Sequence, residues 1–179
     1  MADKCAVTTT TSDNSLSRVD EDMIKEMGAE AAAAQWLIRN GAKVKWGKNG
    51  DMFDDYDKLM NSEASRSNFI SEIDATNSSI THVGFPYLKN LKSLRKIVFN
   101  ETEYLEDKAL HLLGEYQLPT LKHLEVIKCH DITDDGVRAL QKIKTLNYLK
   151  LQGLSSVTNK AACSELLEKE LTNCDVDWD

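Results

Sequence analysis

The chain has 179 residues, of which 41% are hydrophobic and 28% are charged. This composition is typical of a folded globular protein and excludes a largely disordered chain. The formal net charge of −7 opposes the phosphate contacts on which nucleic-acid binding depends, so nucleic acid is not an expected partner.

The first 17 residues are rich in threonine and serine, and we expect a disordered tail there. Asp3, Asp13 and the lack of any arginine before Arg18 make this tail a poor organellar transit peptide. The cysteines of the chain lie far apart and form no Cys-x-x-Cys pair, which favours reduced thiols over disulfides or a zinc finger. No stretch reaches the roughly 20 apolar residues that a transmembrane helix needs.

Residues 18–69 are expected to form an N-terminal capping domain of mixed structure. A helix is predicted from Asp20 to Asn40 by an apolar stripe at helical spacing, and Gly41 ends it. Residues 42–46 alternate between apolar and polar side chains like a short strand, and residues 47–68 are expected to form a polar connector. Repeat arrays need such a unit over the first open edge of their core.

The connector contains four aspartates that could ligate a hard cation, namely Asp51, Asp54, Asp55 and Asp57. It has neither the glycine nor the closing glutamate of an EF-hand loop at the required offsets. A solvated acidic loop is therefore the favoured interpretation of these side chains.

From Ile70 onward the chain repeats the pattern Leu-x-x-Leu-x-Leu. The copies begin 24, 27 and 25 residues apart at Ile70, Leu94, Leu121 and Leu146. This spacing matches the period of leucine-rich repeats, roughly 20 to 29 residues. After each of the last three strands, an apolar residue is followed by side-chain oxygen acceptors placed to cap a predicted helix, namely Glu106-Asp107, Thr133-Asp134 and Thr158-Asn159. These helices are expected at Lys108–Tyr116, Gly136–Ile143 and Lys160–Leu171.

The predicted fold class is therefore α/β. Residues 70–179 are expected to form a short leucine-rich-repeat solenoid of about four strand–turn–helix repeats, since stacking several repeats is what creates their core. The third copy, LKHLEVIKCHDITDDGVRAL, resembles the cysteine-containing subclass of these repeats. Its Cys129 is expected to point inward and to be inert, because buried structural cysteines are unreactive.

An enzymatic function is not expected. The sequence holds no glycine-flanked nucleophile elbow and no phosphate-cradling loop. The four histidines lack metal-ligand spacing, apart from the adjacent Cys129 and His130, which would point to opposite faces. A metal-dependent enzyme stays open as a remote alternative that would need the acidic loop to converge with a titratable base.

The expected functional surface is the face of the strands that points away from the helices. In the repeat frame, these outward positions mix acids, bases, an aromatic ring and aliphatic side chains, which can recognise a protein partner. The candidate partner-binding residues are Glu72, Asp74, Lys96, Val98, His123, Glu125, Ile127, Tyr148, Lys150 and Gln152.

Five segments of the chain form a distinctive set, namely VDEDMIKEMGAEAAAAQWLIRNGAKVKW, ISEIDAT, ITHVGF, LEDKAL and LEVIKCHDITDDGVRALQKIKTLNYLKLQGL. Together they resemble the mitochondrial ATP synthase subunit s family, also called coupling factor B. The resemblance runs from about Arg18 to Leu154, and the N-terminal segment with Gly28 and Trp36 is its most specific part, because generic repeat proteins lack it.

This resemblance implies a non-catalytic coupling factor on the matrix side of the mitochondrial inner membrane, associated peripherally through protein partners. Its expected partners are membrane-sector subunits of ATP synthase, where it would support proton conduction and block proton leak. The family is also understood to hold a structural magnesium ion through backbone carbonyls, which fall here on Gly28 and on or next to Asn61. A cysteine pair of well-known members is replaced by Asn100 and Thr102, so thiol-based regulation is not expected.

Two other binding functions stay open at this stage. The first is an assembly factor for the membrane arm of respiratory complex I, because a related group shares the cap and the repeats. The second is a substrate receptor of a ubiquitin ligase, although such receptors normally carry an F-box helical module that the sequence lacks.

Overall fold

The computed structural model describes residues 21–48, 50–62 and 69–179 of the chain. In order, its elements are α1 (Glu21–Met27), α2 (Ala29–Arg39), β1 (Lys43–Trp46), β2 (Met52–Phe53), α3 (Tyr56–Met60), β3 (Ile70–Asp74), the 3₁₀ helix η2 (His82–Asn90), β4 (Lys96–Asn100), α4 (Asp107–Tyr116), β5 (His123–Ile127), α5 (Asp134–Ala139), the 3₁₀ helix η3 (Leu140–Lys142), β6 (Tyr148–Gln152), α6 (Lys160–Glu170) and β7 (Asp175–Trp178).

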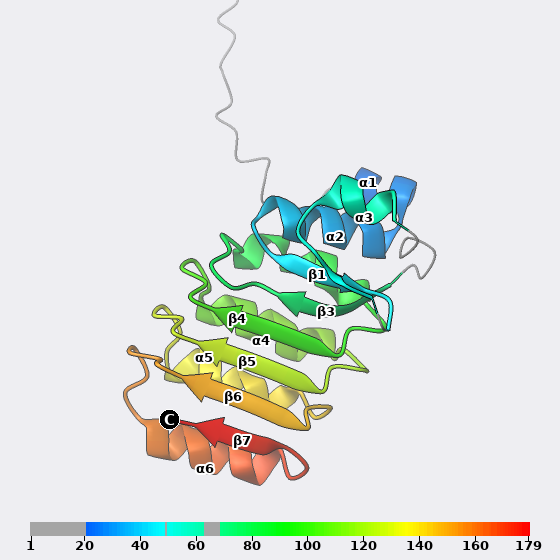
Figure 1. The fold of residues 1–179 in the computed structure, drawn as a ribbon. Helices are drawn as coiled ribbons and strands as arrows, with labels where there is room; N and C mark the ends of the chain where they lie inside the picture. Colours follow the sequence, from blue (N-terminus) through cyan, green and yellow to red (C-terminus); the bar gives the residue numbers. More distant parts are fainter. Residues whose placement is uncertain (1–20, 49, 63–68) are drawn as a thin grey trace, which may run out of the picture.

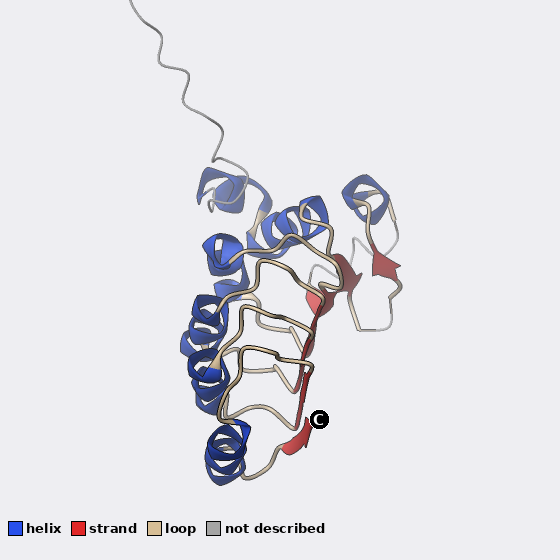
Figure 2. Cartoon of the chain, turned by 90° about the vertical axis from the view of Figure 1, so that its left-hand side faces the viewer, coloured by secondary structure: helices blue, strands red, loops and turns tan. Residues whose placement is uncertain are grey.

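The strands form one seven-stranded sheet in the order β2-β1-β3-β4-β5-β6-β7 (Figure 1). Strands β3 to β7 are parallel neighbours, whereas β1 pairs antiparallel with both β2 and β3. Helices line one face of the sheet, while the opposite face of the parallel strands is open (Figure 2). The α/β class is confirmed, and each of the four predicted repeat strands is present as β3, β4, β5 or β6.

The inward residues of each strand form the core, as period-two alternation requires. Ile97, Leu124 and Leu149 share one rung of the sheet, and all three are fully buried. A single apolar cluster extends from Ala32 in α2 to Leu171 after α6. The sheet and its helices therefore share one continuous core.

The turns after successive strands are stacked on one another. Asn77, Glu101, Lys128 and Gly153 occupy the same position in four repeats, with φ of 55°, 53°, 49° and 64°. Left-handed backbone is unfavourable for residues other than glycine. The Asn77, Glu101 and Lys128 N–H groups each donate to a carbonyl of the next strand, at 2.9, 2.9 and 2.8 Å. These bonds offset the strain.

Carboxylates join the starts of neighbouring helices. Asp107 accepts hydrogen bonds from the backbone N–H and the hydroxyl of Thr133, at 2.8 and 2.6 Å. Asp134 accepts the same pair from Thr158, at 3.1 and 2.6 Å. These hydrogen bonds hold the start of α4 to the start of α5, and the start of α5 to the segment before α6, and they add to the packing of the apolar core.

The predicted helix caps are confirmed for two of three helices. Thr133 accepts from Asp135 N–H at the start of α5, and Asn159 accepts from Ala162 N–H in α6. Glu106 precedes α4 without a side-chain cap, so this prediction was wrong.

The N-terminal region differs from expectation. The single helix predicted from Asp20 to Asn40 is split into α1 and α2, because Gly28 adopts φ 89° and ψ 157°, which is not helical. The predicted connector contains β2 and α3, and Asp55 caps α3 by accepting from Lys58 N–H at 3.1 Å. The expected disordered tail, residues 1–17, lies outside the described residues.

Cys129 is completely buried at the turn after β5, as predicted. Its thiol lies 3.4 Å from the Ile127 carbonyl and 3.9 Å from the Phe99 carbonyl. Burial raises the pKa of this thiol, which favours the unreactive protonated form. Within the described ranges, no helix has both the length and the apolar character needed to cross a bilayer.

Candidate functional site

All ten candidate partner-binding residues lie on the open side of the sheet. Each is half-buried and alternates with buried neighbours along its strand. Neighbouring strands add five residues to the same surface through their register. We call this surface the outer face and define it as Lys43, Lys45, Met52, Glu72, Asp74, Lys96, Val98, His123, Glu125, Ile127, Tyr148, Lys150, Gln152, Asp175 and Asp177.

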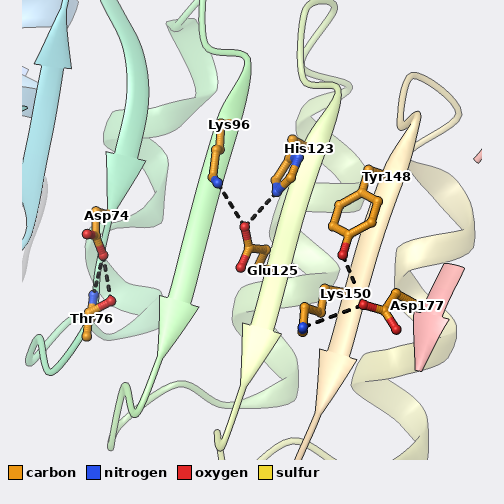
Figure 3. A network of polar contacts seen from close by, with 8 residues as sticks. All are labelled: Asp74, Thr76, Lys96, His123, Glu125, Tyr148, Lys150 and Asp177. Carbon is orange, nitrogen blue, oxygen red and sulfur yellow. Dashed lines mark hydrogen bonds and ion pairs between the residues drawn. The ribbon is translucent and has the colours of Figure 1, made fainter. Parts of the chain in front are cut away.

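At the centre of the outer face, Lys96 and His123 converge on Glu125 (Figure 3). Lys96 Nζ lies 2.8 Å and His123 Nε2 lies 2.6 Å from the same carboxylate oxygen. Burial tends to raise the pKa of Glu125, but the hydrogen bonds and charges of Lys96 and His123 outweigh it and hold the pKa below its ordinary 4.5. This carboxylate is therefore ionised and held by two donors.

A second cluster joins β6 to β7. Asp177 accepts a hydrogen bond from the Tyr148 hydroxyl at 3.0 Å and lies 3.5 Å from Lys150 Nζ (Figure 3). The His123 ring packs against the Tyr148 ring at 4.6 Å between centroids, which links the two clusters. The hydrogen bond to Asp177 raises the pKa of Tyr148, with burial and nearby acids adding to it.

Reasoning from the sequence missed the contribution of β7. Asp175 and Asp177 extend the outer face, while Val176 and Trp178 lie opposite Leu149 and Leu151 of β6. The alternation of acidic and apolar residues in Asp-Val-Asp-Trp was the available signal. It is weak, because aspartate is depleted in strands.

The other end of the outer face is hollowed. Met52, Glu72, Ile73, Asp74, Lys96 and Val98 line a hollow of about 190 Å³. Glu72 is paired with Lys45 at 3.0 Å, whereas Asp74 accepts bonds only from the N–H and hydroxyl of Thr76, at 3.0 and 2.6 Å, among the described residues (Figure 3). Met52 stands at the rim with 40% of its surface exposed. This hollow combines apolar walls with a carboxylate.

The four aspartates of the connector do not converge with these groups. Asp55 caps α3, and Asp54 lies 4.0 Å from Lys43 Nζ. Asp51 and Asp57 are exposed to solvent. The arrangement agrees with the favoured interpretation of a solvated acidic loop.

The two residues expected to hold magnesium lie in different settings. Gly28 lines a hollow of about 320 Å³ whose lining does not include Asn61. The Gly28 carbonyl accepts the Ala32 N–H at 3.0 Å and retains a second lone pair. Asn61 ends α3, and its backbone and side-chain amides both donate to the Asp57 carbonyl.

Other groups near Gly28 offer little to a cation. The Glu30 carboxylate in the same hollow accepts from Ile70 N–H at 2.8 Å, and burial raises its pKa. The buried indole N–H of Trp46 has no hydrogen-bond partner in the part of the chain that the structure describes, and as a donor it cannot ligate a metal. The described parts of the chain hold no group of three or more His, Cys, Asp or Glu arranged for a metal ion. A cation here would depend on backbone carbonyls and water.

Most charged groups of the outer face are paired within the chain, as Lys45 is with Glu72, Lys96 with Glu125 and Lys150 with Asp177. Such groups are held in place by their neighbours, so a partner meets a surface of defined shape and polarity. Lys96, Glu125 and Lys150 retain only 35%, 18% and 29% of their side-chain exposure. This geometry suits recognition of a protein partner.

No protein-family model matches the chain. Among characterised proteins, it is similar to ATP synthase subunit s, mitochondrial, from Rattus norvegicus, with 35% identity over 161 residues that cover 89% of this chain and 80% of the rat protein. The Homo sapiens protein of that name is 34% identical over 145 residues, 80% of this chain and 72% of its own length.

The protein of that name from Bos taurus is 30% identical over 164 residues, which span 90% of this chain and 82% of the bovine protein. In each case, the similarity extends over the N-terminal region and the repeats together, as the resemblance found in the sequence implied. The chain therefore belongs to the mitochondrial ATP synthase subunit s family.

Proposed function

We propose that this chain is a non-catalytic subunit of mitochondrial ATP synthase that acts by binding other subunits through its outer face. The observation that carries the proposal is its similarity to proteins named ATP synthase subunit s over most of both chains. The outer face supports it, because its side chains are positioned by pairing within the chain.

The stacked units are, in this proposal, a leucine-rich-repeat solenoid of the cysteine-containing type. Three features support this assignment: the recurring strand spacing, the left-handed residue after each of four strands, and the buried Cys129 at the turn after β5. Solenoids of this kind commonly bind partners on their strand face.

The partner in this proposal is the membrane sector of the enzyme, approached from the matrix side of the inner membrane. The chain associates peripherally through protein contacts, where it supports proton conduction and prevents proton leak. ATP-driven proton pumping in inner-membrane vesicles depleted of this protein tests the role. Adding back the protein should restore pumping, and unchanged pumping after depletion and add-back would contradict it.

The binding proposal is tested by capture of tagged protein from a mild-detergent mitochondrial extract, with subunits identified by mass spectrometry. The native chain should recover membrane-sector subunits of ATP synthase. A variant with Tyr148→Ala and Lys150→Glu should recover less, because it removes the cluster around Asp177. Lys169→Glu, which reverses the charge of an exposed lysine on α6, is the matched control.

The outcomes separate this function from its alternatives. Recovery of complex I assembly factors, or of ubiquitin-ligase scaffold proteins, in place of ATP synthase subunits would overturn the proposal. Equal loss of capture for Lys169→Glu would contradict the assignment to the outer face.

Magnesium binding at the carbonyls of Gly28 and Asn61 is part of this proposal as a structural role only. Oxygen ligands suit this cation, and most of its coordination shell would be water. Because a ligand that binds only the folded state raises the melting temperature, millimolar magnesium should raise the Tm and EDTA should reverse the change. An identical Tm in magnesium and in EDTA would contradict the site.

A further inference from the structure

Within residues 21–48, 50–62 and 69–179, the hollow at the N-terminal end of the outer face has one carboxylate without a counter-charge. Among the described residues, no lysine, arginine or histidine lies within ion-pair distance of Asp74. Lys43, its ladder neighbour on β1, lies instead 4.0 Å from Asp54. Val98, its neighbour on β4, is apolar. Asp74 therefore faces the hollow as an uncompensated negative charge.

The other charged groups of the hollow are already neutralised. Glu72 is paired with Lys45 at 3.0 Å. Lys96 is paired with Glu125 at 2.8 Å, so its charge is directed to the centre of the outer face. Among the charged groups of the hollow that the structure describes, Asp74 is therefore the one without an ionic partner.

The walls of the hollow are suited to a hydrocarbon chain. Met52 rises from the short strand β2 directly across from Lys45, and 40% of its surface is exposed. Val98 is half-buried on β4 and lines the same hollow, so the two side chains offer apolar contact in the hollow that Asp74 also lines. A thioether side chain adapts readily to varied occupants.

We propose that this hollow binds a basic side chain, lysine or arginine, of the protein segment that docks on the outer face. The aliphatic stem lies against Met52 and Val98, and the cationic end meets the Asp74 carboxylate. The inference rests on the proposed function, and it names the chemistry by which the partner is recognised.

Other occupants fit the hollow less well. An acidic side chain or a phosphate would meet a charge of the same sign. An apolar side chain would cover the carboxylate without supplying a partner, and an unpaired buried charge is costly. A basic side chain supplies both the apolar contact and the counter-charge.

The first test uses a probe that carries only this chemistry. Nα-acetyl-arginine amide is titrated into the full chain, and the methyl signals of Met52 and Val98 are followed by NMR. Shifts saturating at about millimolar concentrations are expected from one exposed ion pair and a short apolar contact. Nα-acetyl-citrulline amide, which has the same shape without the charge, should produce no saturating shift.

Variants identify the carboxylate responsible. Asp74→Asn keeps an oxygen that can accept the Thr76 N–H, so it removes the charge while preserving the turn. Binding of the arginine probe should weaken about tenfold, the equivalent of one charged hydrogen bond. Asp131→Asn makes the same change at an exposed site outside the hollow and should leave binding unchanged.

A second variant distinguishes loss of the binding site from a folding defect. Met52→Lys places a lysine at the exposed rim, where it can neutralise Asp74 from within the chain and should abolish probe binding. Equal responses to the arginine and citrulline probes, or full binding by Asp74→Asn, would overturn the inference.

Capture from mitochondrial extract distinguishes this inference from the proposed function. Native capture of ATP synthase subunits that Asp74→Asn weakens supports both. If Asp74→Asn captures them as well as the native chain, the hollow has no role in docking, and the proposed function still stands. If the native chain captures none, the proposed function fails, and the probe titration alone decides what the hollow binds.

Discussion

The two faces of the sheet are built from alternate residues of the same strands, yet different forces hold them. On the inner face, Leu124 and its neighbours are fully buried among apolar side chains. On the outer face, Glu125 keeps 18% of its side-chain surface and is held by two specific donors. The inner face thus stabilises the fold by burying apolar surface, whereas the outer face presents charges that are held in defined positions. Substitutions that change binding specificity on the outer face should therefore cost little of the stability that the inner face provides.

The largest expected effect comes from creating a cavity in the core under the inner face. Leu124→Ala should lower the free energy of unfolding by about 2–5 kcal/mol, since it removes a buried side chain and leaves a cavity. His123→Ala, one residue earlier but on the outer face, should cost about 1 kcal/mol or less. Urea denaturation measures both, and similar losses for the two variants would refute the contrast between the faces.

Adding volume to the helical layer behind the inner face should cost somewhat less. A Cβ at Gly84 would lie 2.1 Å from the Trp36 ring, so one of them must move. Gly84→Ala should lower the free energy of unfolding by about 1–3 kcal/mol. Thermal unfolding followed by tryptophan fluorescence measures the change, and an unaltered Tm would show that this layer has spare room.

On the outer face, the expected effect is smaller and depends on pH. The pKa of Glu125 is lowered in the folded chain, so its stabilisation is complete well above its ordinary 4.5 and is lost as pH falls through the lowered value. At pH 7, Glu125→Gln should lower the free energy of unfolding by about 1 kcal/mol or less. This difference in the free energy of unfolding between the variant and the native chain should disappear on acidification. A difference that widens at low pH would contradict the assignment.

The smallest expected effect is a change in the pKa of one side chain on the outer face. The Tyr148 hydroxyl donates to Asp177, and this bond raises the pKa of Tyr148 above 10.0. Asp177→Asn should therefore lower the pKa of Tyr148, which NMR titration of the ring carbons can follow. A pKa that does not move would mean that the bond to Asp177 is not formed in solution.

The sequence predicted the inner face and the positions on the outer face well. The Leu-x-x-Leu-x-Leu pattern identifies strands β3 to β6. Its frame also determines which side chains point inward, because a shift by one residue would move every side chain to the other face. The same alternation places Glu72 and Lys150 on the open side of the sheet. Side-chain direction follows directly from this period.

The pairings on the outer face could not be predicted in the same way. Which cation reaches Glu125 depends on the register between β4 and β5 and on side-chain rotamers, and periodicity determines neither. Strand β7 was missed because its aspartates are unfavourable in strands. The break at Gly28 was missed because an isolated glycine does not always end a helix.

The most direct test of the central claim is photo-crosslinking from the outer face in intact mitochondria. A photoreactive amino acid replaces Ile127, which is half-buried at the end of β5 on that face, and a second chain carries it at Glu115, exposed on α4. Adducts with membrane-sector subunits of ATP synthase from position 127 and none from position 115 are expected. Adducts with ATP synthase only from position 115, or with unrelated proteins from position 127, would contradict the account.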